Sequence, residues 1–440
     1  MQRPDNYLPN VRQQYEALPY PARDPQDENK RLVLSWLDDL PMINHYCFAG
    51  KQSFRNNFRA LVAGGGTGDA TIFLAQQLRH TNAEVVHLDL SEASTAIARE
   101  RATVRGLTNI VWIRDSLLNL ASLDVGQFDY INCSGVLHHL ADPDLGFRAL
   151  QGVLAPHGAI GLMVYGTTGR TGVYQMQSLL RMVNDGEHDM PRKISNARDL
   201  LESLPPSNWF KRADNLHSDH RTGDSGIFDL LLHSKDRSYS VAELFDWLGG
   251  PGDQATGHGM HLEFSDVQRG RAPYLPHMVL GHRPPAMMQT LRAMPRRQQY
   301  AMAELMVGNL ITHSLYATHS PDCTAPYGDP NYVPQYFHEP VNPDALANIF
   351  SASRGQPFQL QHQHSGTTMM VNPGRYAAQI LRLIDGQRSF ADIFAQFRAD
   401  WRGKAAPPDD ATLFADFAEV YHTLNALERI LLRHRLADTS

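Results

Sequence analysis

The sequence predicts an α/β protein built on a doubly wound, mostly parallel, seven-stranded sheet, with a mainly helical accessory region and a small α+β domain after it. Two observations support this prediction. Short apolar runs alternate with amphipathic stretches between about residues 57 and 166, at the rhythm of βαβ units. A glycine-rich turn directly follows the first apolar run, which is where such sheets bind nucleotides.

Between an apolar run at 58–63 and a helix-like stretch at 70–78 lies the glycine-rich turn: Gly64, Gly65, Gly66, Thr67 and Gly68. Glycine accepts positive φ and has no Cβ, so a ligand can approach the peptide planes where the helix begins. A dinucleotide fingerprint needs a small third residue where this chain has Asp69 or Thr71. A phosphate loop would need a following Gly-Lys-Ser/Thr, which the chain lacks, so the spacing present is Gly-x-Gly-x-Gly.

Four further strands are expected, at residues 85–89, 110–113, 128–133 and 158–164. The second strand ends in Asp89, whose carboxylate can hold a ribose diol through two hydrogen bonds. Leu90 opens a helix that is expected to reach about Arg105, and Asp115 and Ser116 follow the third strand. In parallel sheets ligands lie at the carboxyl ends of the strands, where all these polar residues fall.

These residues together resemble the Rossmann-like core of the class I S-adenosylmethionine (SAM) methyltransferases, whose motif I is Gly-x-Gly-x-Gly. In that family the residues after the third strand contact the adenine amino group. One departure is Val62, where the family usually carries an acid that Asp69 can only partly replace. The resemblance implies SAM as cofactor, with these cofactor-binding residues: Gly64, Gly65, Gly66, Gly68, Asp69, Asp89, Leu90, Asp115, Ser116 and Cys133.

The turn after the fourth strand, Leu137-His138-His139-Leu140-Ala141-Asp142-Pro143, resembles the small-molecule branch of the family, which includes quinone C-methylases and many O-methyltransferases. His138 and His139 are the candidate catalytic residues, because an imidazole suits removal of a proton from the methyl acceptor. The competing interpretation is that the pair only shapes the pocket. Amino-group methylases of nucleic acid carry Asp/Asn-Pro-Pro-Tyr where this chain has Asn-Cys-Ser-Gly at 132–135.

Five regions are expected along the chain: an N-terminal lid at 1–56, the SAM-binding core at 57–166, an accessory substrate-side region at 167–320, a linker at 321–344 and a C-terminal domain at 345–440. Tyr165, Arg170 and Tyr174 are the candidate substrate-binding residues, since they lie in a glycine-punctuated loop at the end of the fifth strand. Arg170 is equally compatible with a surface connector. The last region resembles PqqD-like winged-helix modules, with a plain structural or dimerising domain as the alternative.

Composition fits an enzyme without nucleic-acid or membrane partners. The net charge of -6 gives no general attraction to nucleic acid, and no run of about 18 apolar residues occurs. The three cysteines are too few for a disulfide framework, so a cytoplasmic location is expected. No metal site is expected, because no histidine pair has a matching set of cysteine or acidic residues nearby in the sequence.

The sequence therefore predicts a SAM-dependent methyltransferase that moves the methyl group by in-line displacement to an O, C or N nucleophile of a small organic acceptor. Two alternatives remain open at this point. The chain is either a peptide or protein methyltransferase that recruits its acceptor through the C-terminal domain, or a noncatalytic SAM-binding scaffold. A homodimer is compatible with each of these.

Overall fold

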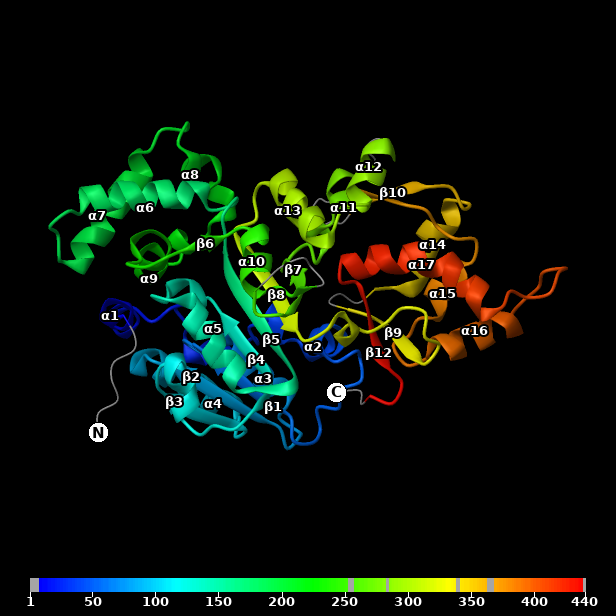
Figure 1. The fold of residues 1–440 in the computed structure, drawn as a ribbon, viewed down its shortest axis with the longest axis horizontal. Coiled ribbons are helices and arrows are strands. Elements are labelled where there is room, and N and C mark those ends of the chain that lie inside the picture. The colour runs from blue at the N-terminus through cyan, green and yellow to red at the C-terminus, as the bar shows by residue number, and fades with distance from the viewer. Residues whose placement is uncertain (1–7, 252–256, 282–284, 338–340, 362–367, 438–440) are drawn as a thin grey trace. The chain divides into compact units, whose positions relative to one another are not determined.

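The computed structural model describes residues 8–251, 257–281, 285–337, 341–361 and 368–437. Its contacts divide the chain into two compact units. The first unit contains residues 1–39, 54–244 and 308–315, and the second contains residues 40–53, 245–307 and 316–440. The predicted accessory region at 167–320 is thus shared between the two units, which are described separately below (Figure 1).

The first unit is built on a parallel sheet. Its strands are β1 (Arg59–Ala63), β2 (Glu84–Asp89), β3 (Ile110–Arg114), β4 (Phe128–Ser134), β5 (Leu154–Gly166), β6 (Ser238–Tyr239) and the first part of β8 (Thr312–Thr318). Within this unit, neighbours follow the order β3-β2-β1-β4-β5-β8, with β6 beside β5, and the pairs among β1 to β6 are parallel. The predicted Rossmann-like sheet is confirmed, with the two-residue strand β6 as an addition.

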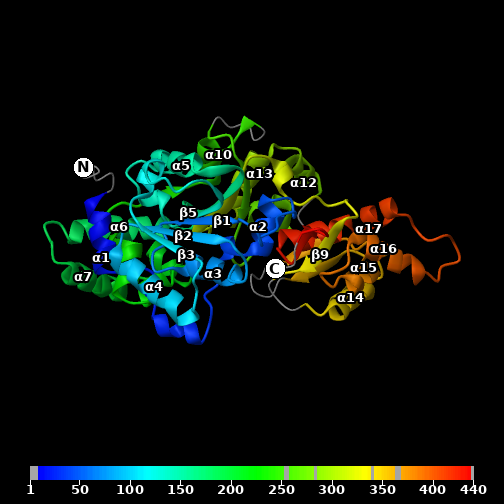
Figure 2. The same cartoon turned by 90° about the horizontal axis from the view of Figure 1, so that it is seen from below.

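Helices lie on both sides of these strands. Figure 2 shows α3 (Asp69–Gln77) and α4 (Glu92–Arg105) on one side and α5 (Pro143–Gly152) on the other. Helix α4 begins where predicted because the Ser91 side chain accepts a hydrogen bond from the Ser94 N–H at 3.1 Å. It ends at Gly106, whose φ of 64° is the left-handed conformation that glycine adopts readily. The doubly wound arrangement follows from this alternation.

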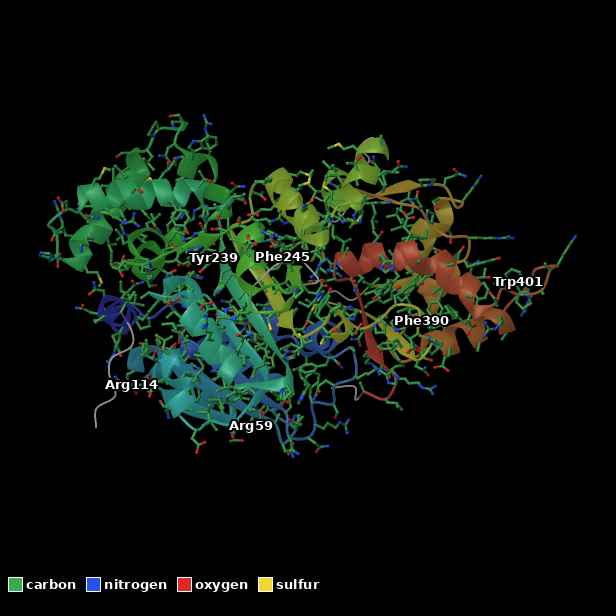
Figure 3. The ribbon with its side chains drawn as sticks, in the orientation of Figure 1. Arg59, Arg114, Tyr239, Phe245, Phe390 and Trp401 are labelled. Atoms are coloured by element: carbon green, nitrogen blue, oxygen red, sulfur yellow. The ribbon has the colours of Figure 1, made fainter. Side chains whose placement is uncertain are left out.

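Strand order reverses between β1 and β4, which are direct neighbours. In doubly wound sheets, ligands bind at such a reversal, outside the carboxyl ends of the strands. Figure 3 labels Arg59 at the start of β1 and Arg114 at the end of β3, so the strands run from the Arg59 edge toward the Arg114 edge. The glycine turn after β1 and the histidine pair after β4 therefore belong to the ligand-binding edge.

The N-terminal segment differs from its prediction. An amphipathic helix is expected near residues 30–40, but the structure has α1 (Pro9–Ala17) and two short 3₁₀ turns, Pro25–Asn29 and Trp36–Asp38. Side chains from the sheet and from α3 instead bind carbonyl groups of this segment. The Tyr130 hydroxyl donates to the Leu37 carbonyl at 2.7 Å, and the Gln77 side chain donates to the Asp38 carbonyl at 2.8 Å. These tertiary hydrogen bonds override the local helical pattern.

Beyond β5, the first unit continues with helices that pack on one another. They are α6 (Thr171–Val183), α7 (Met190–Ser203), α8 (Trp209–Arg212), α9 (Asp224–Ile227), a π-helical turn (Phe228–Leu232) and the start of α10 (Val241–Leu248). Their shared core includes Val173, Met176, Phe210 and Leu231. The predicted capping box before α10 is present, since the Glu243 N–H donates to Ser240 Oγ and the Ser240 N–H to the Glu243 carboxylate.

The second unit is mixed α+β. Its elements are α2 (Leu40–Cys47), β7 (His261–Ser265), α11 (Pro276–Leu280), α12 (Pro285–Arg292), α13 (Arg296–Val307), β9 (Tyr332–Tyr336), α14 (Pro343–Ala352), β10 (Phe358–Gln361), β11 (Thr368–Val371), α15 (Ala377–Leu383), α16 (Phe390–Ala399), α17 (Asp410–Ala426) and β12 (Ile430–His434). Strands β9 and β12 pair, as do β10 and β11. Phe390, labelled in Figure 3, lies in the core of this unit. The sequence pattern of residues 295–316 predicts a single helix, which is wrong in its second half, because α13 ends at Val307 and β8 follows.

No helix within the described ranges is long and apolar enough to cross a membrane.

A buried ion network ties the N-terminal segment to α4. Arg101 is 1% exposed and binds Glu28 at 2.7 Å and Asp69 at 2.7 Å. Glu28, 3% exposed, also pairs with Arg105. Because removal of one partner leaves a buried charge uncompensated, such networks are sensitive to single substitutions.

We predict that Arg101→Met lowers the free energy of unfolding by about 3 kcal/mol, measured by urea denaturation. The matched control is Arg148→Met, which removes an exposed pair with Asp144 on α5 and should cost less than about 1 kcal/mol. Equal losses in the two variants would show that the buried network does not hold the segment in place.

Candidate active site

The glycine turn adopts the backbone geometry that its sequence requires. Gly64, Gly66 and Gly68 have φ values of 78°, 52° and 100°, which is the region that favours glycine. A Cβ on Gly64 would lie 2.3 Å from Val136 Cγ2, so the turn packs directly against the loop after β4. A Cβ on Gly65 would lie 2.3 Å from His87 Nδ1, on the strand below. The turn is therefore shaped by neighbours on both β2 and the β4 loop.

Asp89, at the end of β2, connects this turn to the start of α4. Its Oδ2 accepts a hydrogen bond from the Gly66 N–H at 2.7 Å, and its Oδ1 accepts one from the Ser91 N–H at 2.8 Å. Burial raises the pKa of Asp89, while these backbone hydrogen bonds oppose the rise. Each carboxylate oxygen can accept a second hydrogen bond, so the group remains suited to a ribose diol.

Asp69 faces the N-terminal segment. Its Oδ1 accepts from Arg23 Nε at 2.8 Å and from Arg101 Nη1 at 2.7 Å, and its Oδ2 accepts from Arg23 Nη2 at 2.5 Å. The two guanidinium groups lower the pKa of Asp69 against the effect of burial. Asp69 thus anchors residues before the sheet, and a direct part in cofactor binding stays a prediction.

The same N-terminal segment runs across the glycine turn. Thr67 Oγ1 donates to the Pro21 carbonyl at 2.8 Å, and a Cβ on Gly66 would lie 3.2 Å from the Tyr20 carbonyl oxygen. Glu16 accepts from the N–H groups of Glu92 and Ala93 at 2.9 and 3.1 Å, at the N-terminus of α4. Residues 15–23 are therefore part of the site and touch both cofactor-binding loops.

The remaining predicted cofactor residues lie along the same edge of the sheet. The Asp115 carboxylate, after β3, accepts from the Ser116 N–H and from Asn119 Nδ2, each at 2.7 Å. Ser116 Oγ accepts from the Leu118 N–H, which starts a 3₁₀ turn. Leu90 is half-buried, whereas the Cys133 side chain is fully buried, and burial raises the pKa of its thiol to about 12. A contact through the Cys133 thiol would need an opening that the structure does not have.

His138 and His139 lie buried after β4, beside Tyr165 at the end of β5. The ring centroids of His138 and Tyr165 are 3.9 Å apart, and those of the two histidines are 4.2 Å apart. Neither ring nitrogen of His138 has a hydrogen-bond partner among the described residues, and burial lowers the pKa of His138 well below its usual value. His139 Nδ1 lies 2.7 Å from the Lys235 carbonyl oxygen.

Three further polar residues complete this cluster: Tyr15, Asp229 and His233. The Tyr15 hydroxyl donates to Asp229 Oδ1 at 3.1 Å, and the Tyr165 hydroxyl donates to Asp229 Oδ2 at 3.3 Å. The His233 ring stacks on His139 with centroids 3.8 Å apart. Sequence alone does not bring these residues together, because 214 positions separate Tyr15 from Asp229.

Arg170 and Tyr174 are engaged with Asp236. Arg170 Nη2 binds Asp236 Oδ2 at 3.0 Å, and the Tyr174 hydroxyl donates to Asp236 Oδ1 at the same distance. The Arg170 guanidinium lies over the Tyr165 ring at 3.5 Å from its centroid. The positive charge of Arg170 is thus balanced within the protein, which weakens the prediction that it holds an acidic group of the substrate.

The site accordingly has two parts that join at the reversal between β1 and β4. The glycine turn and Asp89 lie at the place where an adenosyl ligand binds in such sheets, and Asp89 keeps acceptor positions for a diol. The histidine and tyrosine cluster after β4 fits a methyl acceptor. Val136 connects the two parts by its contact with Gly64.

Comparison with known proteins agrees with this geometry. Residues 61–160 match the family described as "Methyltransferase domain". A protein described as uncharacterized from Synechococcus is 29% identical over 72% of this chain and 73% of its own length. The ubiquinone biosynthesis O-methyltransferase of Acinetobacter baumannii is 26% identical over 37% of this chain, and the alignment spans 64% of that enzyme.

The fold of most of the chain recurs in a solved structure, PKMT2 from Rickettsia typhi. The similarity covers 90% of this chain and 75% of that one, with a TM-score of 0.57 and 15% sequence identity. A second structure of PKMT2, in complex with AdoHcy, matches with the same TM-score. The resemblance of the C-terminal region to PqqD-like modules stays a prediction.

The family match identifies residues 61–160 as a methyltransferase domain, and the sheet order and the glycine turn are those of the class I SAM-dependent fold.

We predict that Asp89→Ala weakens SAM binding by at least about tenfold in a calorimetric titration, because it removes the acceptor for the diol and releases the Gly66 N–H. The matched control is Glu84→Ala at the opposite end of β2, which should leave the affinity unchanged. An unchanged affinity in Asp89→Ala would place the cofactor elsewhere.

Proposed function

We propose that this methyltransferase moves the methyl group by in-line displacement to an O, C or N nucleophile of a small organic acceptor, and that a hydroxyl is the favoured nucleophile. The observation that carries the proposal is His139, buried in the loop after β4, whose Nδ1 is bound to the Lys235 carbonyl. A carbonyl can only accept, so Nδ1 carries the hydrogen and Nε2 keeps its lone pair. Such a nitrogen can take a proton from an acceptor hydroxyl.

The residues of the site divide the chemical work between them. SAM, when bound, supplies a methyl group on a sulfonium, which is a good leaving group. The glycine turn and Asp89 hold the adenosyl portion, and the cluster after β4 holds the acceptor in line with the methyl group. Alignment of this kind supplies about 7–11 kcal/mol of the barrier reduction. His139 takes the proton of the acceptor as its bond to the methyl group forms.

Two observations support a small acceptor. The cluster is enclosed, with His138 fully buried, His139 5% exposed and Tyr165 9% exposed. A relative in Acinetobacter baumannii carries the name of an O-methyltransferase of ubiquinone biosynthesis. His138, whose two ring nitrogens have no partner among the described residues, adds a polar group that a bound acceptor can satisfy.

The experiment is incubation of the full chain with methyl-labelled SAM and fractionated cell extract. Label in a small-molecule fraction supports the proposal. Label in a peptide or protein fraction favours the alternative of a peptide methyltransferase. Absence of label from every fraction, while SAM binds measurably, favours a noncatalytic scaffold.

We predict that His139→Gln lowers kcat by about 10²- to 10⁴-fold with little change in SAM affinity, because it removes the base and not the cofactor site. The rate is measured with the acceptor found in the labelling experiment. The control is His157→Gln, an exposed histidine that pairs with Asp129 at the opposite edge of the sheet. Full activity in His139→Gln would exclude a proton-accepting role for this residue.

A further inference from the structure

The strongest unassigned feature is the group His139, Asp229 and His233, three buried residues from different parts of the chain. One potential ligand atom from each lies within 4.8 Å of the other two. Two histidines and a carboxylate at this spacing suggest a metal site at first sight. The hydrogen bonds around the two rings decide whether that interpretation holds.

Both rings form a hydrogen bond with the backbone of Lys235, but His139 donates to it and His233 accepts from it. His139 Nδ1 donates to the Lys235 carbonyl at 2.7 Å, which leaves the lone pair of His139 at Nε2. The Lys235 N–H donates to His233 Nδ1 at 3.1 Å, so the lone pair of His233 is at Nδ1 and already used. A neutral His233 then carries its hydrogen at Nε2, and burial lowers the pKa of His233 to about 2, which keeps the ring neutral.

The hydrogen at His233 Nε2 has an acceptor nearby. Nε2 lies 3.4 Å from the Tyr15 hydroxyl oxygen, and that hydroxyl donates to Asp229 Oδ1 at 3.1 Å. The direction of every hydrogen bond is therefore set, from Lys235 N–H through His233 and Tyr15 to Asp229. Among the described residues, no group donates to His139 Nε2.

This arrangement argues against a metal. An ion at the three residues would need a lone pair from each, but His233 presents a hydrogen where the ion would bind. Only His139 Nε2 and the Asp229 carboxylate remain as ligands. The carboxylate also accepts from Tyr15 and Tyr165 and has no basic residue paired with it in the described part of the chain. A buried carboxylate of this kind favours a neighbouring positive charge.

We propose that the backbone of Lys235, through its N–H and its carbonyl, fixes opposite tautomers of His139 and His233, and that it thereby makes the cluster a proton-accepting site and not a metal site. The inference rests on the proposed function and specifies its chemistry. The methyl–sulfur bond breaks with its electron pair on sulfur, the acceptor forms its bond to the methyl group, and the acceptor proton moves to His139 Nε2. The resulting imidazolium faces the Asp229 carboxylate.

Two residues act through others in this scheme. Lys235 is a positioning residue through its backbone N–H and carbonyl, while its side chain is exposed. Tyr15 is a second positioning residue, because it joins His233 to Asp229. Tyr15 belongs to the N-terminal segment that crosses the glycine turn, so the proton-accepting cluster is complete only when that segment is in place.

The test is a tautomer measurement by long-range ¹H–¹⁵N NMR on the full chain, labelled in histidine and bound to AdoHcy. Loss of signals in His139→Gln and His233→Gln assigns the two rings. The expected result is a hydrogen on Nδ1 of His139 and on Nε2 of His233. Lys235→Ala keeps the backbone N–H and should leave the tautomers of both rings unchanged. Lys235→Pro removes that N–H and should produce a mixture of tautomers for His233. The opposite tautomer at either ring, or equal changes in the two Lys235 variants, would overturn the proposal.

A second pair of variants covers the case in which Lys235→Pro does not fold. Tyr15→Phe should abolish the slowly exchanging Nε2–H signal of His233, because its acceptor is lost. Tyr20→Phe is the matched control, since Tyr20 lies on the same segment and donates at 3.0 Å to a different carboxylate, Asp219. Equal behaviour of these two variants would contradict a role for Tyr15.

Addition of one equivalent of Co²⁺ or Zn²⁺ to the full chain tests the metal directly. We expect no bound ion after dialysis, and a stoichiometric ion that is lost in His233→Gln would overturn the proposal. If NMR shows the expected tautomers but no extract fraction yields a labelled product, the proposed function is refuted and the role of Lys235 still stands. The two failures are therefore distinguishable.

Discussion

The site depends on the carboxylate of Asp89, which holds two loops of the sheet in one geometry. It accepts hydrogen bonds from the turn after β1 and from the loop after β2, so the two cofactor-binding segments share one anchor. Because both contacts use backbone N–H groups, they fix the course of the chain and not only the position of a side chain. The acceptors that Asp89 presents to a diol are thereby oriented before the ligand arrives.

The N-terminal segment adds a second level of organisation. Arg23 of this segment binds Asp69, which follows the glycine turn. Its two tyrosines lie on the acceptor side, where Tyr15 donates to Asp229 and Tyr20 donates to Asp219. One short segment therefore contacts the cofactor side and the acceptor side of the same unit. The geometry of the site in the first unit therefore depends on this segment as well as on the sheet.

Much of the fold was predictable from local patterns. The limits of α4 were readable from Ser91 and Gly106, and the strands from apolar runs that end in polar residues. The predicted helix near residues 30–40 failed because Tyr130 and Gln77, distant in sequence, bind the carbonyl groups of that segment. Local propensity does not contain such contacts.

The cofactor half of the site was readable for a related reason, since a glycine turn and an acid at a strand end follow one another closely in the chain. The acceptor half was not. Tyr15, His139 and Asp229 come from three separate regions, and only the packing of the accessory helices brings them together. The pairing of Arg170 with Asp236 was not readable for the same reason, because the two residues are 66 positions apart.

The approach of His87 to Gly65 has a consequence for how this sequence can change over evolutionary time. Any side chain at position 65 would overlap the imidazole below it, which Thr71 Oγ1 holds from the neighbouring helix at 2.8 Å. Positions 65, 87 and 71 are therefore coupled, so that a substitution at one of them requires a compensating substitution at another. Neutral variation at these three positions has to proceed by paired substitutions.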